Sequence, residues 1–126
     1  MQIRESAEDY LETVLMLQQR LGYARSIDVA AELGFSKPSV SVAMKKFREN
    51  GLVEFDDKGY ISLTDAGRMI AERTLEKHNL LAGYLIGIGV SEKTAREDAC
   101  RIEHALSTET FEKIKEFAAA YKEKRQ

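Results

Sequence analysis

The stretch EDACRIEHALS, residues 97–107, places a thiol, a carboxylate and an imidazole within five positions of one another. Cys100, Glu103 and His104 are spaced i, i+3 and i+4, so a helix would carry them on one side. Cys100 is the only cysteine of the chain, and His104 is one of 2 histidines. Such a set can bind a divalent metal. It can equally be a small core residue beside two surface residues, and the choice depends on the elements around it.

The other histidine, His78, falls in the middle of an apolar stripe on a long expected helix. The stripe is formed by Ala71, Leu75, Leu81, Ala82 and Leu85. A histidine in such a place is usually a hydrogen-bonded core residue. In this chain it means that both histidines occupy inward-facing positions, which favours a shared site.

Two carboxylates, Asp9 and Glu12, are spaced i, i+3 on the first expected helix. They lie opposite an apolar side made of Leu11, Val14 and Leu15. Taken alone they are an ordinary solvated acidic face. Combined with the other two helices they would complete a mixed site of oxygen, nitrogen and one sulfur ligand, which suits Mn²⁺ and Fe²⁺. Spacing alone leaves open whether the three helices converge.

The composition favours a soluble, mostly helical protein. Of the 126 residues, 44 % are apolar and 32 % are charged, with a single proline. No apolar run approaches the roughly 20 residues that cross a bilayer. The acidic start MQIRESAEDYLE lacks the apolar core of a signal peptide, and a lone thiol fits a reducing compartment. We therefore expect a cytoplasmic protein.

Periodicity and capping residues predict six helices and one hairpin. Ser26, Ser36, Thr64 and Ser91 are the expected N-caps, and Gly34 and Gly51 the expected ends of the second and third helices. Four helices are expected over residues 5–20, 65–86, 91–106 and 108–121, followed by a solvated tail, KEKRQ. Between the first two, a short helix is expected to follow the Ser26 cap and end at Gly34, and another to follow the Ser36 cap and run to about Asn50. The turn residues DDKG separate two β-prone runs and predict the hairpin between the third and fourth helices.

Two short helices joined by a tight turn and followed by a hairpin are typical of a winged helix-turn-helix. From Arg20 to Arg48 there are six basic residues and two acidic ones, a surplus of four positive charges in a chain of net charge −2. This local surplus is the charge pattern of a duplex-binding element. The alternative is a helix pair in a bundle with a solvated basic face.

The second helix of the pair is expected to read bases near its N-terminus and to contact phosphates about two turns later. Val40, Ala43, Met44 and Phe47 can pack inward while the remaining side chains face DNA. The predicted DNA-binding residues are Arg25, Ser36, Lys37, Pro38, Ser39, Ser41, Val42, Lys45, Lys46 and Lys58.

Five segments, taken in order, resemble one known family. They are EDYLETVLML, SVSVAMKKFRENGLV, LTDAG, KHNLL and ACRIEHALS. Together they are similar to the diphtheria-toxin-repressor family of iron- and manganese-dependent transcriptional repressors, over residues 4–118. The resemblance implies a winged helix-turn-helix domain followed by a helical dimerisation domain, with divalent metal bound between them. It also implies a homodimer on a palindromic operator in double-stranded DNA.

Position by position, the resemblance implies a metal site of Asp9, Glu12, His78, Cys100, Glu103 and His104. Asp9 and Glu12 match the manganese-responsive branch. Cys100 matches the iron-responsive branch, because the manganese branch has glutamate there, so the site is a hybrid. Ala82 and Arg96 replace the ancillary site of the iron branch. Val42 stands where that branch has a base-reading glutamine, so its operator preference does not transfer.

We therefore expect a mainly α protein, with the DNA-binding domain over residues 1–72 and the metal-binding and dimerisation domain over residues 73–126. The expected function is repression of metal-uptake genes, activated by Mn²⁺ or Fe²⁺, with no membrane partner. The expected dimer surface is Tyr84, Leu85, Ile88, Phe111, Ile114 and Phe117. The first alternative is a winged-helix regulator that responds to an organic ligand or partner protein. A metalloenzyme is the second, disfavoured because no HExxH, CxxC or nucleophile motif is present.

Overall fold

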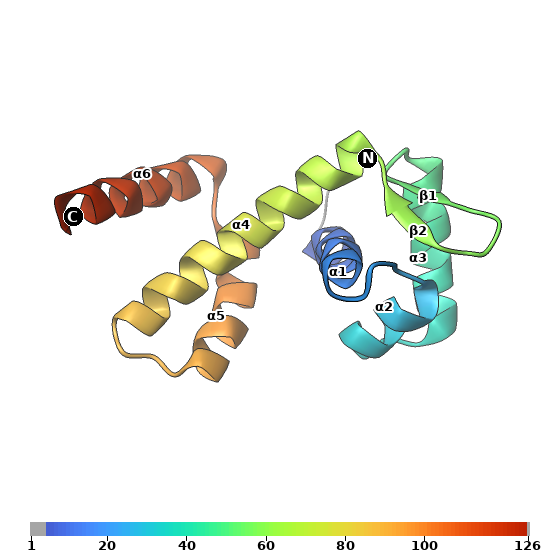
Figure 1. Ribbon diagram of the computed structural model, residues 1–126, viewed down its shortest axis with the longest axis horizontal. Helices are drawn as coiled ribbons and strands as arrows, with labels where there is room; N and C mark the ends of the chain where they lie inside the picture. The colour runs from blue at the N-terminus through green and yellow to red at the C-terminus, as the bar shows by residue number, and fades with distance from the viewer. Residues whose placement is uncertain (1–4, 126) are drawn as a thin grey trace. The chain divides into compact units, whose positions relative to one another are not determined.

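A computed structural model describes residues 5–125, with side chains from 7 to 120. The described chain forms six α-helices and one two-stranded sheet (Figure 1). The elements are α1 (Glu5–Leu21), α2 (Ser26–Leu33), α3 (Lys37–Glu49), β1 (Val53–Phe55), β2 (Ile61–Leu63), α4 (Asp65–Gly87), α5 (Glu92–Ala105) and α6 (Thr108–Arg125). They divide into two compact units, the first ending at Leu75 and the second beginning at Glu76, so the division falls inside α4. The predicted fold class, a winged helix-turn-helix followed by a helical domain, is confirmed.

The core of the first unit joins α1 to the helix pair and the hairpin. Leu11 and Val14 of α1 are completely buried, as are Val40 and Met44 of α3. Tyr10 contributes its ring to the same core, 5.5 Å from the ring of Phe47 in an edge-on arrangement. The apolar stripes predicted for α1 and α3 are therefore the faces that pack. This packing leaves the opposite face of α3 exposed.

The turn between α2 and α3 follows the predicted capping. Gly34 has a left-handed backbone with φ 71°, which ends α2, and its N–H donates to the carbonyl of Ala30. The Ser36 hydroxyl accepts a hydrogen bond from the backbone N–H of Ser39 at 3.2 Å, which caps α3.

The predicted cap of α2 is wrong. Ser26 is the first residue of the helix, and Arg25 occupies the N-cap position without a side-chain capping bond. The reason is tertiary: the backbone of Arg25 is paired with Tyr60 in an isolated β-bridge. The segment before α2 is thus held in extended conformation by the hairpin, and the helix begins one residue earlier than its serine suggests.

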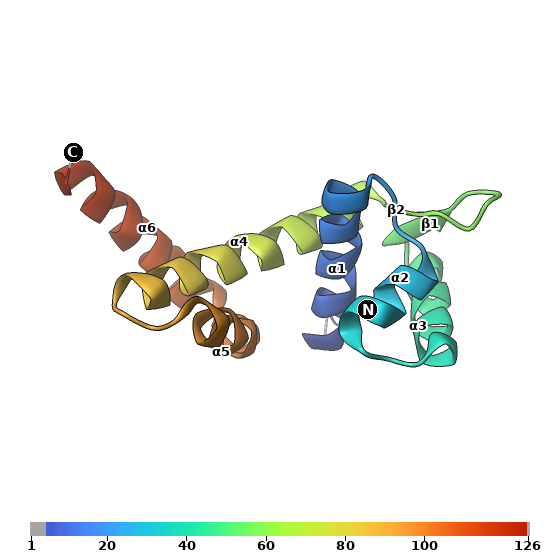
Figure 2. The ribbon, with the colours of Figure 1, turned by 60° about the horizontal axis from the view of Figure 1, so that its bottom comes forward.

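The hairpin forms as predicted, with Val53 opposite Leu63 and Phe55 opposite Ile61. Its turn is closed by Asp56, whose Oδ1 accepts hydrogen bonds from the N–H groups of Lys58 and Tyr60, both at 2.9 Å. Figure 2 shows the turn projecting beyond the helices of its unit. A winged helix-turn-helix carries its wing in this position.

The second unit has a small core of its own. Leu81 and Ala82 of α4 pack against Ala99 of α5, with Leu106 beside them. The α5 helix lies beside the C-terminal part of α4 in both ribbon views (Figures 1 and 2). Ser91 occupies the N-cap position of α5 without a side-chain capping bond. A core of this size stabilises α5 only modestly, because two of its three buried members are alanines.

The last helix corrects two predictions. Residues 122–125, predicted as tail, continue α6 to Arg125, while Gln126 lies outside the described residues. Phe111, predicted at a dimer surface, is only 1 % exposed. It packs beneath the Lys77 ammonium, which lies 5.5 Å from its ring centroid. The Lys115 ammonium and the Glu76 carboxylate form a second link between α6 and α4.

Within the described residues, no helix has both the length and the apolar composition required to cross a membrane.

Candidate metal centre and DNA-binding surface

The second unit buries a carboxylate between two imidazoles. The Glu103 side chain of α5 is 0 % exposed, and its Oε2 lies 3.2 Å from Nδ1 of His78 on α4. Its other oxygen, Oε1, lies 3.4 Å from Nε2 of His104. The imidazoles are themselves largely buried, at 14 % and 4 % exposure of their side chains. Helical spacing places Glu103 and His104 side by side on α5, and the α4–α5 packing adds His78.

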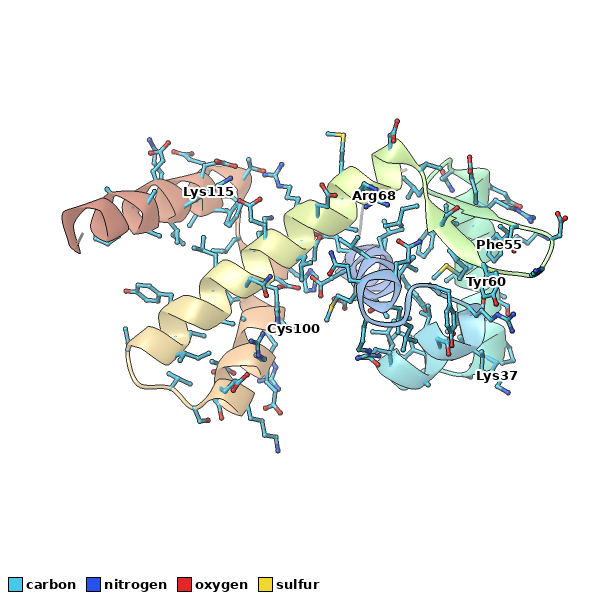
Figure 3. The ribbon with its side chains drawn as sticks, in the orientation of Figure 1. Lys37, Phe55, Tyr60, Arg68, Cys100 and Lys115 are labelled. Carbon is cyan, nitrogen blue, oxygen red and sulfur yellow. The ribbon has the colours of Figure 1, made fainter. Side chains whose placement is uncertain are left out.

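Cys100 completes the cluster from the preceding turn of α5, where Figure 3 labels it. One ligand atom from each of Cys100, Glu103 and His104 lies within 4.8 Å of the others. These three were the spacing-based candidates, and they converge on one side of the helix. The alternative in which Glu103 and His104 are surface residues does not describe this structure.

The donors fit a divalent first-row metal. Neither Glu103 oxygen accepts a hydrogen bond from any described residue, although the carboxylate is completely buried. Burying an ionised carboxylate is costly unless a cation or donors compensate it. A metal ion would supply that compensation, and carboxylate, imidazole and thiolate are all ligands of such ions. His78, Cys100, Glu103 and His104 are thus the residues of this unit that would hold it.

Asp9 and Glu12 belong to the first unit, on α1. Glu12 is buried at 8 % exposure and Asp9 is half-buried. Glu12 is therefore not part of a solvated acidic face, the plain alternative for this pair. Met16, four residues after Glu12 on the same side of α1, is 39 % exposed.

The outward face of α3 presents the predicted DNA-binding residues. The helix exposes Lys37, Pro38, Ser39, Ser41, Val42, Lys45 and Lys46, and Ser36 is exposed at its N-cap. Figure 3 shows Lys37 at the N-terminal end of α3, pointing away from the core of the unit. Residues 36–48 include no aspartate or glutamate, so this face of α3 carries positive charge from its lysines.

A hollow beside α3 includes Arg48, which was counted among the basic residues of this segment but not among the predicted DNA-binding residues. It is lined by Ser26, Ser41, Lys45, Arg48 and Phe55. The Arg48 guanidinium lies 5.7 Å from the ring centroid of Phe55 on β1, and Phe55 is labelled in Figure 3. Helical spacing could have indicated Arg48 from the sequence, because Ser41, Lys45 and Arg48 are spaced i, i+4 and i+7 and share one side of the helix.

The basic residues outside α3 have distinct roles. The Arg25 guanidinium stacks 4.3 Å above the ring of Tyr60, which itself contacts Tyr23 edge-on at 5.5 Å. Lys58 is exposed at the tip of the hairpin. Arg20 is paired with Glu32 at 3.0 Å, and the hydrogen bond to this carboxylate raises its pKa. Arg20 therefore contributes less positive field than the charge count assigned to it.

Two family models match successive parts of the chain. Residues 2–61 match the family model described as iron dependent repressor, N-terminal DNA binding domain. Residues 64–125 match the model described as iron dependent repressor, metal binding and dimerisation domain. The transcriptional regulator MntR of Escherichia coli O157:H7 is 36 % identical over 114 residues, which is 90 % of this chain and 74 % of that protein. The regulator MntR of Bacillus subtilis is 32 % identical over 118 residues, 94 % of this chain and 83 % of that protein.

Solved structures agree in fold. The manganese regulator SloR superposes with a TM-score of 0.78 at 27 % identity, over 94 % of this chain and 55 % of that one. A manganese-dependent transcriptional repressor in complex with manganese superposes with a TM-score of 0.75 at 28 % identity, over 86 % and 50 %. The chain spans about half the length of these structures. It belongs to the iron-dependent, or diphtheria-toxin, repressor family of metal-dependent DNA-binding transcriptional regulators.

Proposed function

We propose that this protein is a homodimeric transcriptional repressor that binds its operator when Mn²⁺ or Fe²⁺ is bound, and that it controls metal-uptake genes in the cytoplasm. The ligands are His78, Cys100, Glu103 and His104, joined by Asp9 and Glu12 from α1. In this proposal residues 1–72 read DNA and residues 73–126 hold the metal and the dimer contacts.

The observation that carries the proposal is the buried Glu103 carboxylate between two imidazoles. Its side chain is 0 % exposed and lies 3.2 Å and 3.4 Å from the two rings. An ordinary core excludes such a group, because its burial is destabilising without compensation. A regulator that responds to an organic ligand has no need for a thiol, a carboxylate and two imidazoles in one buried cluster.

The choice of metal follows from the ligand set. Carboxylates are hard ligands that favour Mn²⁺, and the thiolate of Cys100 is a soft ligand that favours iron. The two solved relatives described above are named for manganese. With two or three carboxylates against one sulfur, we expect both metals to activate and Mn²⁺ to be at least as effective as Fe²⁺.

Activation is a shift between two states of the protein. Without metal, three carboxylates at one site, those of Asp9, Glu12 and Glu103, repel one another and disfavour the DNA-binding arrangement. A bound divalent cation supplies the neutralising charge. The ligands must therefore bind metal more tightly in the DNA-binding state than in the other. In that state a dimer presents its two α3 helices about 34 Å apart, or a multiple of this distance, in successive major grooves.

The test is operator binding titrated with Mn²⁺, Fe²⁺ and Zn²⁺ separately, without oxygen. The operator is obtained first, by selection from random duplexes with metal-saturated protein, and binding is followed by fluorescence anisotropy. We expect sequence-specific binding that a chelator abolishes and added metal restores. Specific binding unaffected by chelator would instead favour a regulator controlled by an organic ligand or partner protein.

A further inference from the structure

Val42 occupies the centre of the outward face of α3. At 100° per residue it lies about 200° from Val40, and hence almost opposite the buried stripe of Val40, Met44 and Phe47. Its exposed fraction is 70 %, against 0 % for Val40. A β-branched residue is a weak helix former, so its presence here does not serve the stability of α3.

The polar groups that flank Val42 at the start of α3 are already engaged. The Ser36 hydroxyl donates to the Ser39 hydroxyl at 2.8 Å, and it accepts from the backbone N–H of Ser39. These capping bonds fix the first turn of the helix. Val42, in the second turn, thus presents an exposed apolar side chain, while the two serines before it serve the cap.

Positive charge surrounds this apolar position. Lys45 and Lys46 follow within one turn of Val42, on either side of its line, and both are exposed. Lysines at such positions match the phosphates that border a groove, and the side chain between them faces the base edges. In the major groove the only apolar feature of a base edge is the C5-methyl group of thymine.

We propose that Val42 determines operator specificity by apolar contact with a thymine methyl group, one in each half-site. This inference rests on the proposed function, because it requires that α3 enters the major groove. It goes beyond that function by naming the base that the central residue of α3 prefers and the chemistry of the preference. Cytosine, which lacks the methyl group and presents an amino donor, is disfavoured at the same position.

The test removes the methyl group without changing base pairing. Each thymine of the selected operator is replaced in turn by deoxyuridine, and affinity is measured with saturating Mn²⁺. We expect one symmetry-related pair of positions to be sensitive, with a loss of about fourfold for one half-site, which corresponds to one buried methyl group, and about 15-fold for both.

The protein side of the test is Val42→Ala, with Met69→Ala as the matched control. Met69 is 72 % exposed on α4 in the same unit and lies outside α3. Deoxyuridine at the sensitive pair should no longer reduce affinity in Val42→Ala, whereas Met69→Ala should behave as the unmodified protein. Equal losses in Val42→Ala and the unmodified protein would overturn the inference, as would an operator without any methyl-sensitive position. Failure to select any specific duplex with Mn²⁺ or Fe²⁺ would overturn the proposed function itself.

Discussion

At the scale of single residues, His78 is the most informative position, because its imidazole lies beside the buried carboxylate of Glu103. His78→Ala removes the only nitrogen ligand that α4 contributes and leaves Glu103 with a single neighbouring imidazole. We expect metal-activated operator binding to be lost, while the metal-free variant keeps its helical circular dichroism because the site lies beside an apolar stripe. Asn79→Ala, an exposed neighbour on the same helix, is the control and should respond to metal normally. Unchanged activation of His78→Ala would identify the imidazole as a core residue.

Cys100 is the residue on which metal selectivity should depend. Cys100→Glu replaces a soft ligand by a hard one, so the site would consist only of oxygen and nitrogen. We expect this variant to retain its response to Mn²⁺ and to lose about tenfold or more of its apparent affinity for Fe²⁺, a difference of about 1.4 kcal/mol. The measurement is the metal concentration that half-saturates operator binding, determined for each metal without oxygen. An unchanged ranking of the two metals would show that the sulfur does not select between them.

The residues of the site differed in how far the sequence could predict them. The clustering of Cys100, Glu103 and His104 follows from helical spacing, which is a local property. The approach of His78 depends on the packing of α4 on α5, which periodicity can only suggest. The sequence left open whether Glu12 lies on a solvated acidic face or in a site, because an amphipathic pattern cannot distinguish a solvated polar face from a covered one.

At the scale of elements, the entry into α4 depends on one glycine. A Cβ added at Gly67 would lie 2.0 Å from the carbonyl oxygen of Leu52, which also accepts the N–H of Thr64 at 3.1 Å. Because both partners are backbone, Gly67→Ala must displace α4 from the hairpin, and we expect a destabilisation of about 2 kcal/mol or more in urea unfolding. Gly83 lies in the same helix with no atom within 4 Å of an added Cβ. Gly83→Ala should therefore stabilise by about 0.5–1 kcal/mol, and equal effects of the two changes would contradict this argument.

Helix α3 supports a second prediction at this scale. Lys45 and Lys46 are exposed on α3 and are expected to contact phosphates rather than bases. Replacing either by alanine should weaken binding to operator and to random duplex alike, and should lower the salt dependence of log K by about one unit. Lys113→Ala on α6, whose ammonium is 3.6 Å from Glu116, is the control and should change neither. A loss restricted to the operator would mean that the lysine reads a base.

The starts of helices were predicted well where the capping hydrogen bond is made within the first turn of the helix. Ser36 and Thr64 cap α3 and α4 through their own hydroxyls, at 3.2 Å and 3.1 Å from the N–H groups of Ser39 and Gly67. The start of α2 was misplaced because the residue before it pairs with the hairpin. The end of α6 was misplaced because KEKR is compatible with both helix and tail, and charge alone does not terminate a helix.

At the scale of the whole molecule, the apolar surface of the second unit predicts how two copies associate. Tyr84 lies near the end of α4 and Ile88 lies in the turn that follows it, and their exposed fractions are 58 % and 65 %. Phe117 of α6 is 69 % exposed. Phe111 no longer belongs to this set, since it is buried. The unit is small and its core is formed largely by alanines, so these side chains represent apolar area that a single copy leaves in water.

We expect Ile88→Asp combined with Phe117→Asp to produce a monomer at micromolar concentration, because each charge would have to be buried without a partner in the dimer. Sedimentation equilibrium with Mn²⁺ present measures this directly. Met69→Asp adds one such charge at a residue of similar exposure in the first unit and should remain dimeric. A monomer also loses the simultaneous engagement of two half-sites, so the double variant should lose far more affinity for the palindromic operator than for a single half-site. A double variant that sediments as a dimer would place the contact between subunits on another surface of the chain.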